Sequence, residues 1–316
     1  MTTASTPSPP SFRREMHPAP ISVSRRDEIH AAPGFGRYFT DHMVLIDFET
    51  GPGWHDPRVV PLLPEEDHSG DPAVRIDSVT KVFTSRHGKV AALDNVSLSV
   101  APGEFVCLLG ASGCGKSTLL NLISKLDYPT TGTVTSLGRP ALMFQEAALF
   151  PWLTAGQNIA LALKYAGVPK RQAKAKINEL LDLVRLSGTA DRRVHELSGG
   201  QRQRISLARA LGQNSDVLLM DEPFAALDAI TRDVMHDELT RVWKETGNSI
   251  VFVTHNVREA VRLGQRVVLL SSRPGRVVGE WKVNIKGPRT IEHPEVGALA
   301  AEITLRLREE IASHAR

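Results

Sequence analysis

A glycine-rich segment, residues 110–117, has the residue types and spacing of a phosphate-binding loop. Its sequence, GASGCGKS, fits the pattern G-x-x-x-x-G-K-[ST]. In such a loop the backbone N–H groups point at phosphate oxygens, the Lys116 ammonium adds positive charge, and the Ser117 hydroxyl can reach Mg²⁺. The alternative is a chance glycine-rich turn, in which Cys114 is either a filler side chain or a redox sensor. The residues expected to bind nucleotide phosphates are Gly110, Ser112, Gly113, Cys114, Gly115, Lys116, Ser117 and Thr118.

Two adjacent carboxylates, Asp221 and Glu222, follow an apolar run at residues 217–220. Ligands bind beyond the carboxyl ends of strands in open α/β sheets. There Asp221 can reach Mg²⁺, directly or through water, and Glu222 can polarise an attacking water as a general base. Alone, such a pair indicates only the end of a strand. About one hundred residues after a phosphate loop, it predicts phosphoryl transfer to water.

A third motif, LSGGQ at residues 197–201, precedes a predicted helix. One interpretation is an ordinary helix whose N-cap is Ser198. The start of such a helix also offers backbone N–H groups and a hydroxyl, which together can bind an anion.

These groups need a scaffold of alternating strands and helices. A continuous apolar run at residues 105–109 predicts a buried strand directly before the phosphate loop, and a helix is predicted after the loop at residues 117–125. The alternation predicts an α/β fold with a mainly parallel sheet. The sequence has no internal repeat, which predicts one ATPase unit and not two. The other predicted strands are residues 74–76, 92–100, 217–220, 250–253 and 267–270, and the other helical segments are residues 156–187, 199–211, 229–246 and 256–263.

The composition is that of an ordinary soluble protein, with 41% hydrophobic and 23% charged residues among 316. A formal net charge of +3 is too small to indicate nucleic-acid binding. The apolar runs are too short to cross a bilayer, and the N-terminal residues lack the apolar core of a secretory signal. Cys107 and Cys114 do not form a disulfide framework. We therefore expect a cytoplasmic protein that does not span the membrane.

In this order and spacing, the three motifs resemble those of ABC transporter ATPases, over residues 73–316. The resemblance implies a P-loop NTPase fold: a RecA-like core, a β-rich edge subdomain near residues 74–106 and a helical subdomain near residues 150–210. It implies ATP and Mg²⁺ as cofactors. It also implies a homodimer in which the LSGGQ segment of each subunit closes over the ATP held by the other. The residues of this segment expected at the nucleotide are Ser198, Gly199, Gly200 and Gln201.

Four single residues match further family positions. By the resemblance, Gln145 approaches Mg²⁺ and faces the permease, Asp228 lies at the dimer contact, His255 contacts the γ-phosphate and the Phe83 ring stacks on adenine. For Phe83 the alternative is a core aromatic, and for His255 an ordinary surface or core histidine. The expected catalytic residues are then Glu222, His255 and Gln145, and the expected metal ligands are Ser117, Gln145 and Asp221.

Residues 141–163, 221–243 and 253–277 resemble the ATPases of nitrate, taurine and aliphatic-sulfonate importers, and the SSRPGR segment at 271–276 is the most telling part. Such ATPases work on the cytoplasmic face of the membrane with a two-copy permease and an extracytoplasmic binding protein. The groove around residues 145–152, with its apolar cluster at residues 150–152, is the expected permease dock, unless Trp152 belongs to the core of the helical subdomain. Ser-Lys replaces the usual Ala-Gly at residues 124–125, away from the nucleotide ligands. The ATPase does not reveal the cargo.

The N-terminal extension, residues 1–72, lies outside the resemblance to ABC transporter ATPases. Residues 1–31 are rich in proline and serine, whereas residues 32–62 resemble the start of a branched-chain amino-acid aminotransferase. Nothing after residue 72 supplies that family's cofactor lysine or phosphate-binding loops, which excludes a pyridoxal enzyme. We interpret the segment as a gene-fusion scar, with a small docking module as the alternative.

The expected function is ATP hydrolysis that drives an import system for nitrate, sulfonate, taurine or a related small solute. The alternative is a soluble ABC ATPase that acts on nucleic acid or ribosomes. That class usually carries a long coiled-coil insertion or two ATPase units in one chain, and this sequence has neither.

Overall fold

The computed structural model describes residues 71–316 except 87, 287–288, 291–292 and 315–316. All of them belong to one unit of the chain, residues 67–316. The predicted N-terminal extension therefore lies outside the described residues, apart from residues 71–72.

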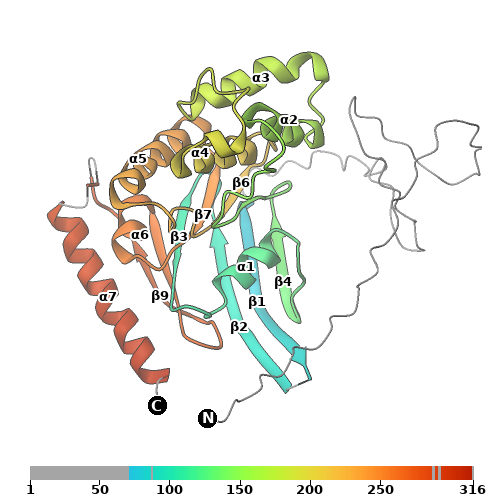
Figure 1. Cartoon of the computed structure of the whole chain (residues 1–316). Helices are drawn as coiled ribbons and strands as arrows, with labels where there is room; N and C mark the ends of the chain where they lie inside the picture. Colours follow the sequence, from blue (N-terminus) through green and yellow to red (C-terminus); the bar gives the residue numbers. More distant parts are fainter. Residues whose placement is uncertain (1–70, 87, 287–288, 291–292, 315–316) are drawn as a thin grey trace, which may run out of the picture. The chain divides into compact units, whose positions relative to one another are not determined.

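A six-stranded sheet with the order β5-β6-β7-β3-β8-β9 forms the centre of this unit (Figure 1). Its first five strands are parallel and β9 is antiparallel to β8. The mainly parallel α/β fold is thus confirmed. The strands are β3 (Phe105–Leu109), β5 (Ala141–Met143), β6 (Val217–Asp221), β7 (Ser249–Val253), β8 (Arg266–Leu270) and β9 (Val277–Lys282).

A second, antiparallel sheet has the order β2-β1-β4, with β1 at Val74–Ser85, β2 at Gly88–Val100 and β4 at Thr131–Ser136. It forms the β-rich edge subdomain, but its extent differs from the expected residues 74–106. β4 joins it from further along the chain, whereas residues 105–106 lie in β3 of the central sheet.

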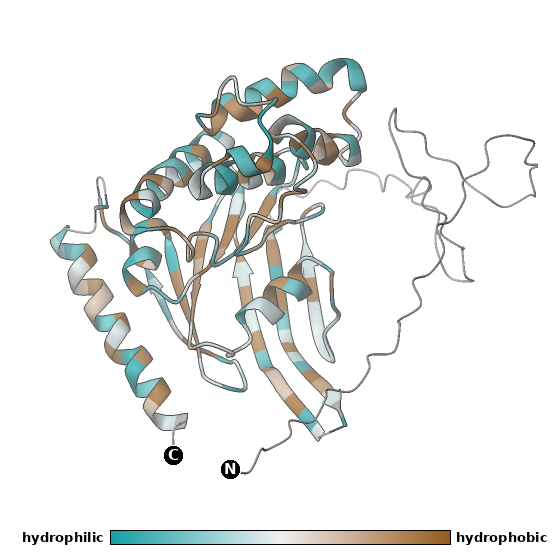
Figure 2. Cartoon of the chain, viewed as in Figure 1, coloured by the Kyte–Doolittle hydropathy of each residue, from teal (hydrophilic) through white to brown (hydrophobic). Residues whose placement is uncertain are grey.

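Alternation of side chains along the central strands creates two cores. One face of the sheet shares a core with the antiparallel sheet and with α1 (Lys116–Ile123). The other face packs against the remaining helices. Hydrophobic residues accordingly concentrate on the strands, whereas α3 is mostly hydrophilic (Figure 2). These helices are α2 (Ala155–Tyr165), α3 (Lys170–Leu183), α4 (Gly199–Leu211), α5 (Ala229–Thr246), α6 (Val257–Leu263) and α7 (Pro294–His314), together with a short 3₁₀ helix at Val194–Glu196.

The helical subdomain predicted near residues 150–210 consists of α2, α3 and α4, which pack on one another (Figure 1). The helical stretch predicted at 156–187 is two helices and not one. It breaks because Gly167 adopts a positive φ and Pro169, which cannot continue α2, is the N-cap of α3. Among the helices described, none combines the length and hydrophobicity needed to cross a membrane.

Candidate active site

The phosphate loop joins β3 to α1 at the carboxyl end of a fully buried central strand. Lys116 begins α1, and its buried side chain turns back into the loop. Its Nζ donates hydrogen bonds to the carbonyl oxygens of Gly110, at 2.9 Å, and Ala111, at 3.1 Å. The Ser112 and Ser117 residues are exposed beside it. A positive charge and two hydroxyls are therefore gathered around one curled backbone.

Two glycines allow this curl. Gly115 has φ +99°, and a Cβ there would lie 2.8 Å from the Ala92 carbonyl oxygen. Gly113 has φ +76°, and a Cβ there would lie 2.6 Å from Nη2 of Arg273. Arg273 comes from the loop after β8, and its Nε donates to the Gly113 carbonyl at 3.1 Å. The phosphate loop is thus packed between β2 and the segment at residues 271–276, a contact that the sequence analysis did not assign.

Glu222, the second acid of the predicted pair, contacts His255, the histidine expected at the γ-phosphate. Asp221 ends β6 and pairs with Val253 of β7, so the residues that follow these two parallel strands emerge side by side. Nδ1 of His255 lies 2.8 Å from Oε2 of Glu222. The backbone N–H of Glu222 donates to the Val253 carbonyl at 3.0 Å, which fixes Glu222 at a φ of +45°. Such a backbone conformation is uncommon for a side-chain-bearing residue and often marks a functional position.

This carboxylate–imidazole pair lies at the same edge of the sheet as the phosphate loop. β7 separates β6 from β3, so both loops leave the carboxyl ends of neighbouring parallel strands. The Glu222 side chain is partly buried and the His255 ring is exposed. A carboxylate here can accept a proton from water, and an imidazole beside it can donate a hydrogen bond to a phosphate oxygen.

The LSGGQ motif forms the start of α4, as predicted, with Ser198 as its N-cap. Oγ of Ser198 accepts from the Gln201 backbone N–H at 3.3 Å, and Oε1 of Gln201 accepts from the Ser198 backbone N–H at 3.0 Å. Ser198 and Gly199 are exposed. In Figure 1, α4 lies among the helices of the helical subdomain, apart from α1 and the phosphate loop. The structure therefore does not place these residues on the chain's own phosphate loop.

Side chains of α4 hold the segment around Gln145. The carbonyl oxygen of exposed Gln145 accepts from Nε2 of buried Gln203 at 2.8 Å. The Arg209 guanidinium donates to the carbonyl oxygens of Ala147, at 3.0 Å, and Ala148, at 2.7 Å. Gln203 and Arg209 could not be assigned from the sequence, because their partners lie about sixty residues away along the chain and α4 contains several other polar and basic residues.

Asp228 and Phe83 are two further residues that the sequence predicts at the nucleotide. Oδ1 of Asp228 accepts from the Thr231 backbone N–H at 3.0 Å and so caps α5. Hydrogen bonding to the Thr231 side chain, and after it to the Thr231 backbone N–H, lowers the pKa of the Asp228 carboxyl. Phe83 lies on β1 and is 44% exposed, with Nζ of Lys81 5.0 Å from its ring centroid. The alternative of a core aromatic at Phe83 is therefore wrong.

An exposed aromatic pair follows the Gln145 segment. The rings of Phe150 and Trp152 lie 5.4 Å apart, and Trp152 is 66% exposed, so it is not part of the helical core. Fully buried Asn158 fixes the backbone beneath them. Its Oδ1 accepts from the Phe150 N–H at 2.9 Å, and its Nδ2 donates to the Thr154 carbonyl at 2.9 Å. The pair is presented on a rigid loop.

Comparison with known proteins agrees with this geometry. Residues 93–225 match the ABC transporter family. The chain is 47% identical over 214 residues to the taurine import ATP-binding protein TauB of Burkholderia pseudomallei (strain 1710b), covering 65% of this chain and 82% of the relative. It is 43% identical over 222 residues to the nitrate import ATP-binding protein NrtD of Synechocystis sp. (strain ATCC 27184 / PCC 6803 / Kazusa), covering 68% of this chain and 84% of the relative.

A solved structure has the same fold. It is a dimeric structure of a post-hydrolysis state of the ATP-binding cassette MJ0796 bound to ADP and Pi, and it superposes with a TM-score of 0.60. The identity is 33%, and the match covers 67% of this chain and all of the cassette. With identities above 40% to relatives that it covers over more than 80% of their length, this chain belongs to the ABC transporter ATP-binding proteins and is an ATP-hydrolysing enzyme.

Proposed function

We propose that Glu222 is the general base of ATP hydrolysis and that His255 works beside it. The observation that carries this proposal is the 2.8 Å contact between the two side chains at the edge of the sheet that bears the phosphate loop. Glu222 would accept the proton of the attacking water. His255 would donate a hydrogen bond to the γ-phosphate, whose charge rises as the bond breaks. Lys116 and the backbone N–H groups of the loop would hold the phosphates.

The residues around the loop suit Mg²⁺ that arrives with ATP. Mg²⁺ in nucleotide sites is held by one or two protein oxygens together with phosphate oxygens and water. The Ser117 hydroxyl, the Asp221 carboxylate and the Gln145 amide oxygen are chemically fitting donors. Among the residues that the structure describes, no group of three or more acidic, histidine or cysteine side chains could hold a metal. When bound, Mg²⁺ neutralises charge on the phosphates.

The functional unit that we propose is a homodimer with two ATP molecules between the subunits. Residues 198–201 form the N-cap and first turn of α4, away from the chain's own phosphate loop, and two of them are exposed. The N–H groups at a helix start bind anions. In a second copy, these N–H groups would meet the γ-phosphate held by the first. The similar cassette of known structure is dimeric.

The transport role that we propose is import of nitrate, sulfonate, taurine or a related small solute, through a separate permease, with a binding protein outside the cell. The sequence relatives are named for taurine and nitrate import. Phe150 and Trp152 form an exposed apolar pair next to the Gln145 segment, and an exposed apolar patch on a rigid loop is a common partner site. The chain would then sit on the cytoplasmic face of the membrane.

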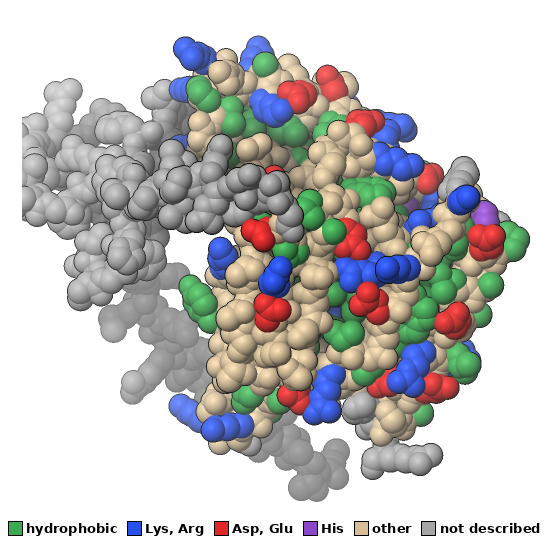
Figure 3. All heavy atoms as spheres, turned by 180° about the vertical axis from the view of Figure 1, so that it is seen from behind, with side chains coloured by type: hydrophobic (Ala, Val, Ile, Leu, Met, Phe, Trp, Pro, Cys, Tyr) green, Lys and Arg blue, Asp and Glu red, His purple; other side chains and the backbone are tan. Residues whose placement is uncertain are grey.

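The alternative, action on nucleic acid, has less support. A nucleic-acid surface gathers lysine and arginine into a patch that tracks the phosphate backbone. On the face seen in Figure 3, acidic and basic side chains are interspersed. The net charge of +3 adds little attraction for a polyanion.

Two substitutions separate binding from hydrolysis. Glu222→Gln keeps the shape of the side chain but removes the base, so turnover should fall about 100-fold or more while ATP affinity stays near wild type. Lys116→Ala removes a buried charge contact to the phosphates, so ATP affinity should fall at least about 30-fold. Steady-state ATPase assays and titration with a fluorescent ATP analogue measure the two effects. Wild-type turnover in purified Glu222→Gln would exclude Glu222 as the base.

A further inference from the structure

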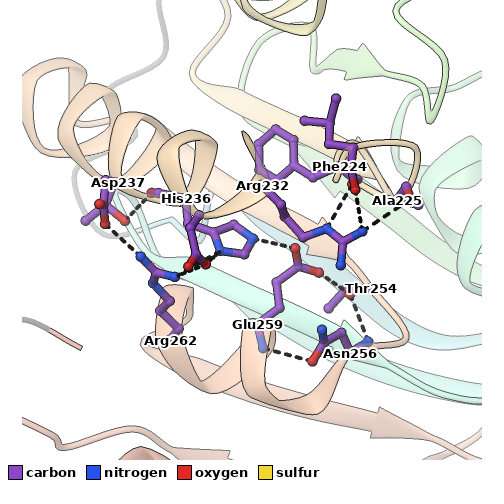
Figure 4. Close-up of polar contacts among 12 residues, drawn as sticks. Phe224, Ala225, Arg232, His236, Asp237, Thr254, Asn256, Glu259 and Arg262 are labelled. Atoms are coloured by element: carbon purple, nitrogen blue, oxygen red, sulfur yellow. Dashed lines mark hydrogen bonds and ion pairs between the residues drawn. The ribbon is translucent and has the colours of Figure 1, made fainter. Parts of the chain in front are cut away.

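A buried polar cluster joins α5, α6 and the turn that precedes α6 (Figure 4). Its centre is His236 on α5, which is 2% exposed, and Glu259 on α6, which is 8% exposed. Nε2 of His236 lies 2.6 Å from Oε1 of Glu259. Burying a carboxylate and an imidazole is costly unless every polar atom is bonded, and apolar side chains of similar volume would often fill such a place at no loss of stability. The pair therefore calls for an explanation beyond packing.

On one side the pair fixes the turn that carries His255. The second oxygen of Glu259, Oε2, accepts a hydrogen bond from the buried Thr254 hydroxyl. The same hydroxyl accepts from the Asn256 backbone N–H at 3.0 Å. Oδ1 of Asn256 accepts in turn from the Glu259 backbone N–H at 3.3 Å, which caps α6. His255 is thus flanked on both sides by residues that are bonded to Glu259.

On the other side the pair is anchored to the helix that follows Glu222. The Arg232 guanidinium, one turn before His236 on α5, donates to the carbonyl oxygens of Phe224, at 3.2 Å, and Leu227, at 2.7 Å. These carbonyls belong to the turn between Glu222 and Asp228. The Phe224 ring also lies 5.7 Å from the His236 ring. α5 therefore holds the segment after Glu222 through Arg232. It holds the His255 turn through His236, which bonds to Glu259.

The cluster continues beyond His236 to Arg262. Nη1 of Arg262 lies 3.4 Å from Nδ1 of His236. Arg262 is itself held by Asp233, at 2.6 Å, and Asp237, at 2.9 Å. A continuous chain of polar contacts therefore runs from Arg262 through His236 and Glu259 to the His255 turn.

We propose that His236 and Glu259 are positioning residues for ATP hydrolysis. They hold the His255 ring against Glu222 and tie both to the turn that ends at Asp228. This inference rests on the proposed roles of Glu222 and His255. Neither His236 nor Glu259 touches the reacting atoms, so their effect passes through the Thr254–Asn256 turn. A shift of about 1 Å in a catalytic side chain can cost a large part of the rate without weakening substrate binding.

The test is a set of paired variants assayed for kcat and for the KM of ATP. Glu259→Gln removes the charge that accepts both hydrogen bonds, and Thr254→Val removes only the hydroxyl; each should lower kcat about tenfold or more and leave KM within about twofold. Thr254→Ser keeps the hydroxyl and should restore kcat. His236→Gln keeps a side-chain N–H donor and should retain more activity than His236→Leu. Glu245→Gln, on the same helix but paired with Arg241 outside the cluster, is the matched control and should behave as wild type.

A double-mutant cycle distinguishes positioning from general loss of stability. If Glu259 acts through His255, Glu259→Gln should lower single-turnover hydrolysis about tenfold in the wild-type background but less than twofold in the His255→Ala background. An equal fall in both backgrounds, or wild-type kcat in Glu259→Gln and Thr254→Val, overturns the inference. Wild-type turnover in His255→Ala overturns it together with the proposed role of His255. If Glu222→Gln and His255→Ala are inactive while Glu259→Gln is fully active, the proposed function stands and only the positioning role is rejected.

Discussion

At the scale of single residues, the site has two kinds of members. Lys116, Glu222 and His255 could be predicted from the sequence, because each lies at a fixed offset in a short motif next to a strand or helix. Gln203 and Glu259 could not. Their partners are 58 and 23 residues away, and only the packing of α4 and α6 brings them together. Motifs identify groups that face the nucleotide, whereas the side chains that hold those groups depend on the tertiary fold.

The two cysteines provide a residue-scale prediction. Both are buried, and burial raises the pKa of each thiol; at Cys114 the nearby Lys116 charge opposes this rise but does not cancel it. A raised pKa means that the thiol stays protonated at neutral pH, and only the thiolate is nucleophilic. Iodoacetamide should therefore label Cys107 and Cys114 far more slowly in the native protein than in urea. Rapid native labelling at Cys114 would revive the redox-sensor alternative for this position.

At the scale of elements, the predicted strands and helices around the motifs are present, and the omissions have physical causes. β5 has only three residues, too few to show a period. β4, with the sequence TGTVTS, is polar and mostly exposed at a sheet edge, so no apolar alternation marks it. β9 and α7 follow Leu270, beyond the last element predicted. Strands that are buried on both faces, such as β3 and β7, were predictable because burial requires a continuous apolar run.

The loop before α2 yields an element-scale prediction. Asn158 makes its backbone rigid, and Trp152 is exposed, so Trp152→Glu should alter the surface without unfolding the protein. In cells that contain the permease, this variant should leave the membrane fraction while the basal ATPase of the purified protein is retained. Tyr165→Glu is the matched control, because Tyr165 is an exposed aromatic on α2 of the same subdomain. If both variants stay on the membrane, or if Trp152→Glu loses ATPase as well, the docking surface lies elsewhere.

At the scale of the whole molecule, every proposed catalytic and binding group lies after residue 72. Deleting residues 1–72 removes none of them and leaves buried Ala73 at the start of the antiparallel sheet, so ATPase rate and melting temperature should stay nearly unchanged. A longer deletion that also removes Val74 and Ile76, which are buried in the sheet core, should be strongly destabilising and serves as the contrast. A large loss of activity on deleting residues 1–72 would make the extension part of the enzyme and reject the fusion-scar interpretation.

We propose that two copies of this chain enclose ATP and that Glu222 is the base that hydrolyses it. Light scattering of purified Glu222→Gln, with and without Mg·ATP, tests it most directly. We predict twice the mass of one chain when ATP is present and the mass of a single chain after ATP is removed, because the variant closes on ATP and cannot hydrolyse it. Substituting Ser198 by Arg in the same variant should abolish this dimer. A Glu222→Gln protein that binds ATP and yet stays monomeric would contradict the claim.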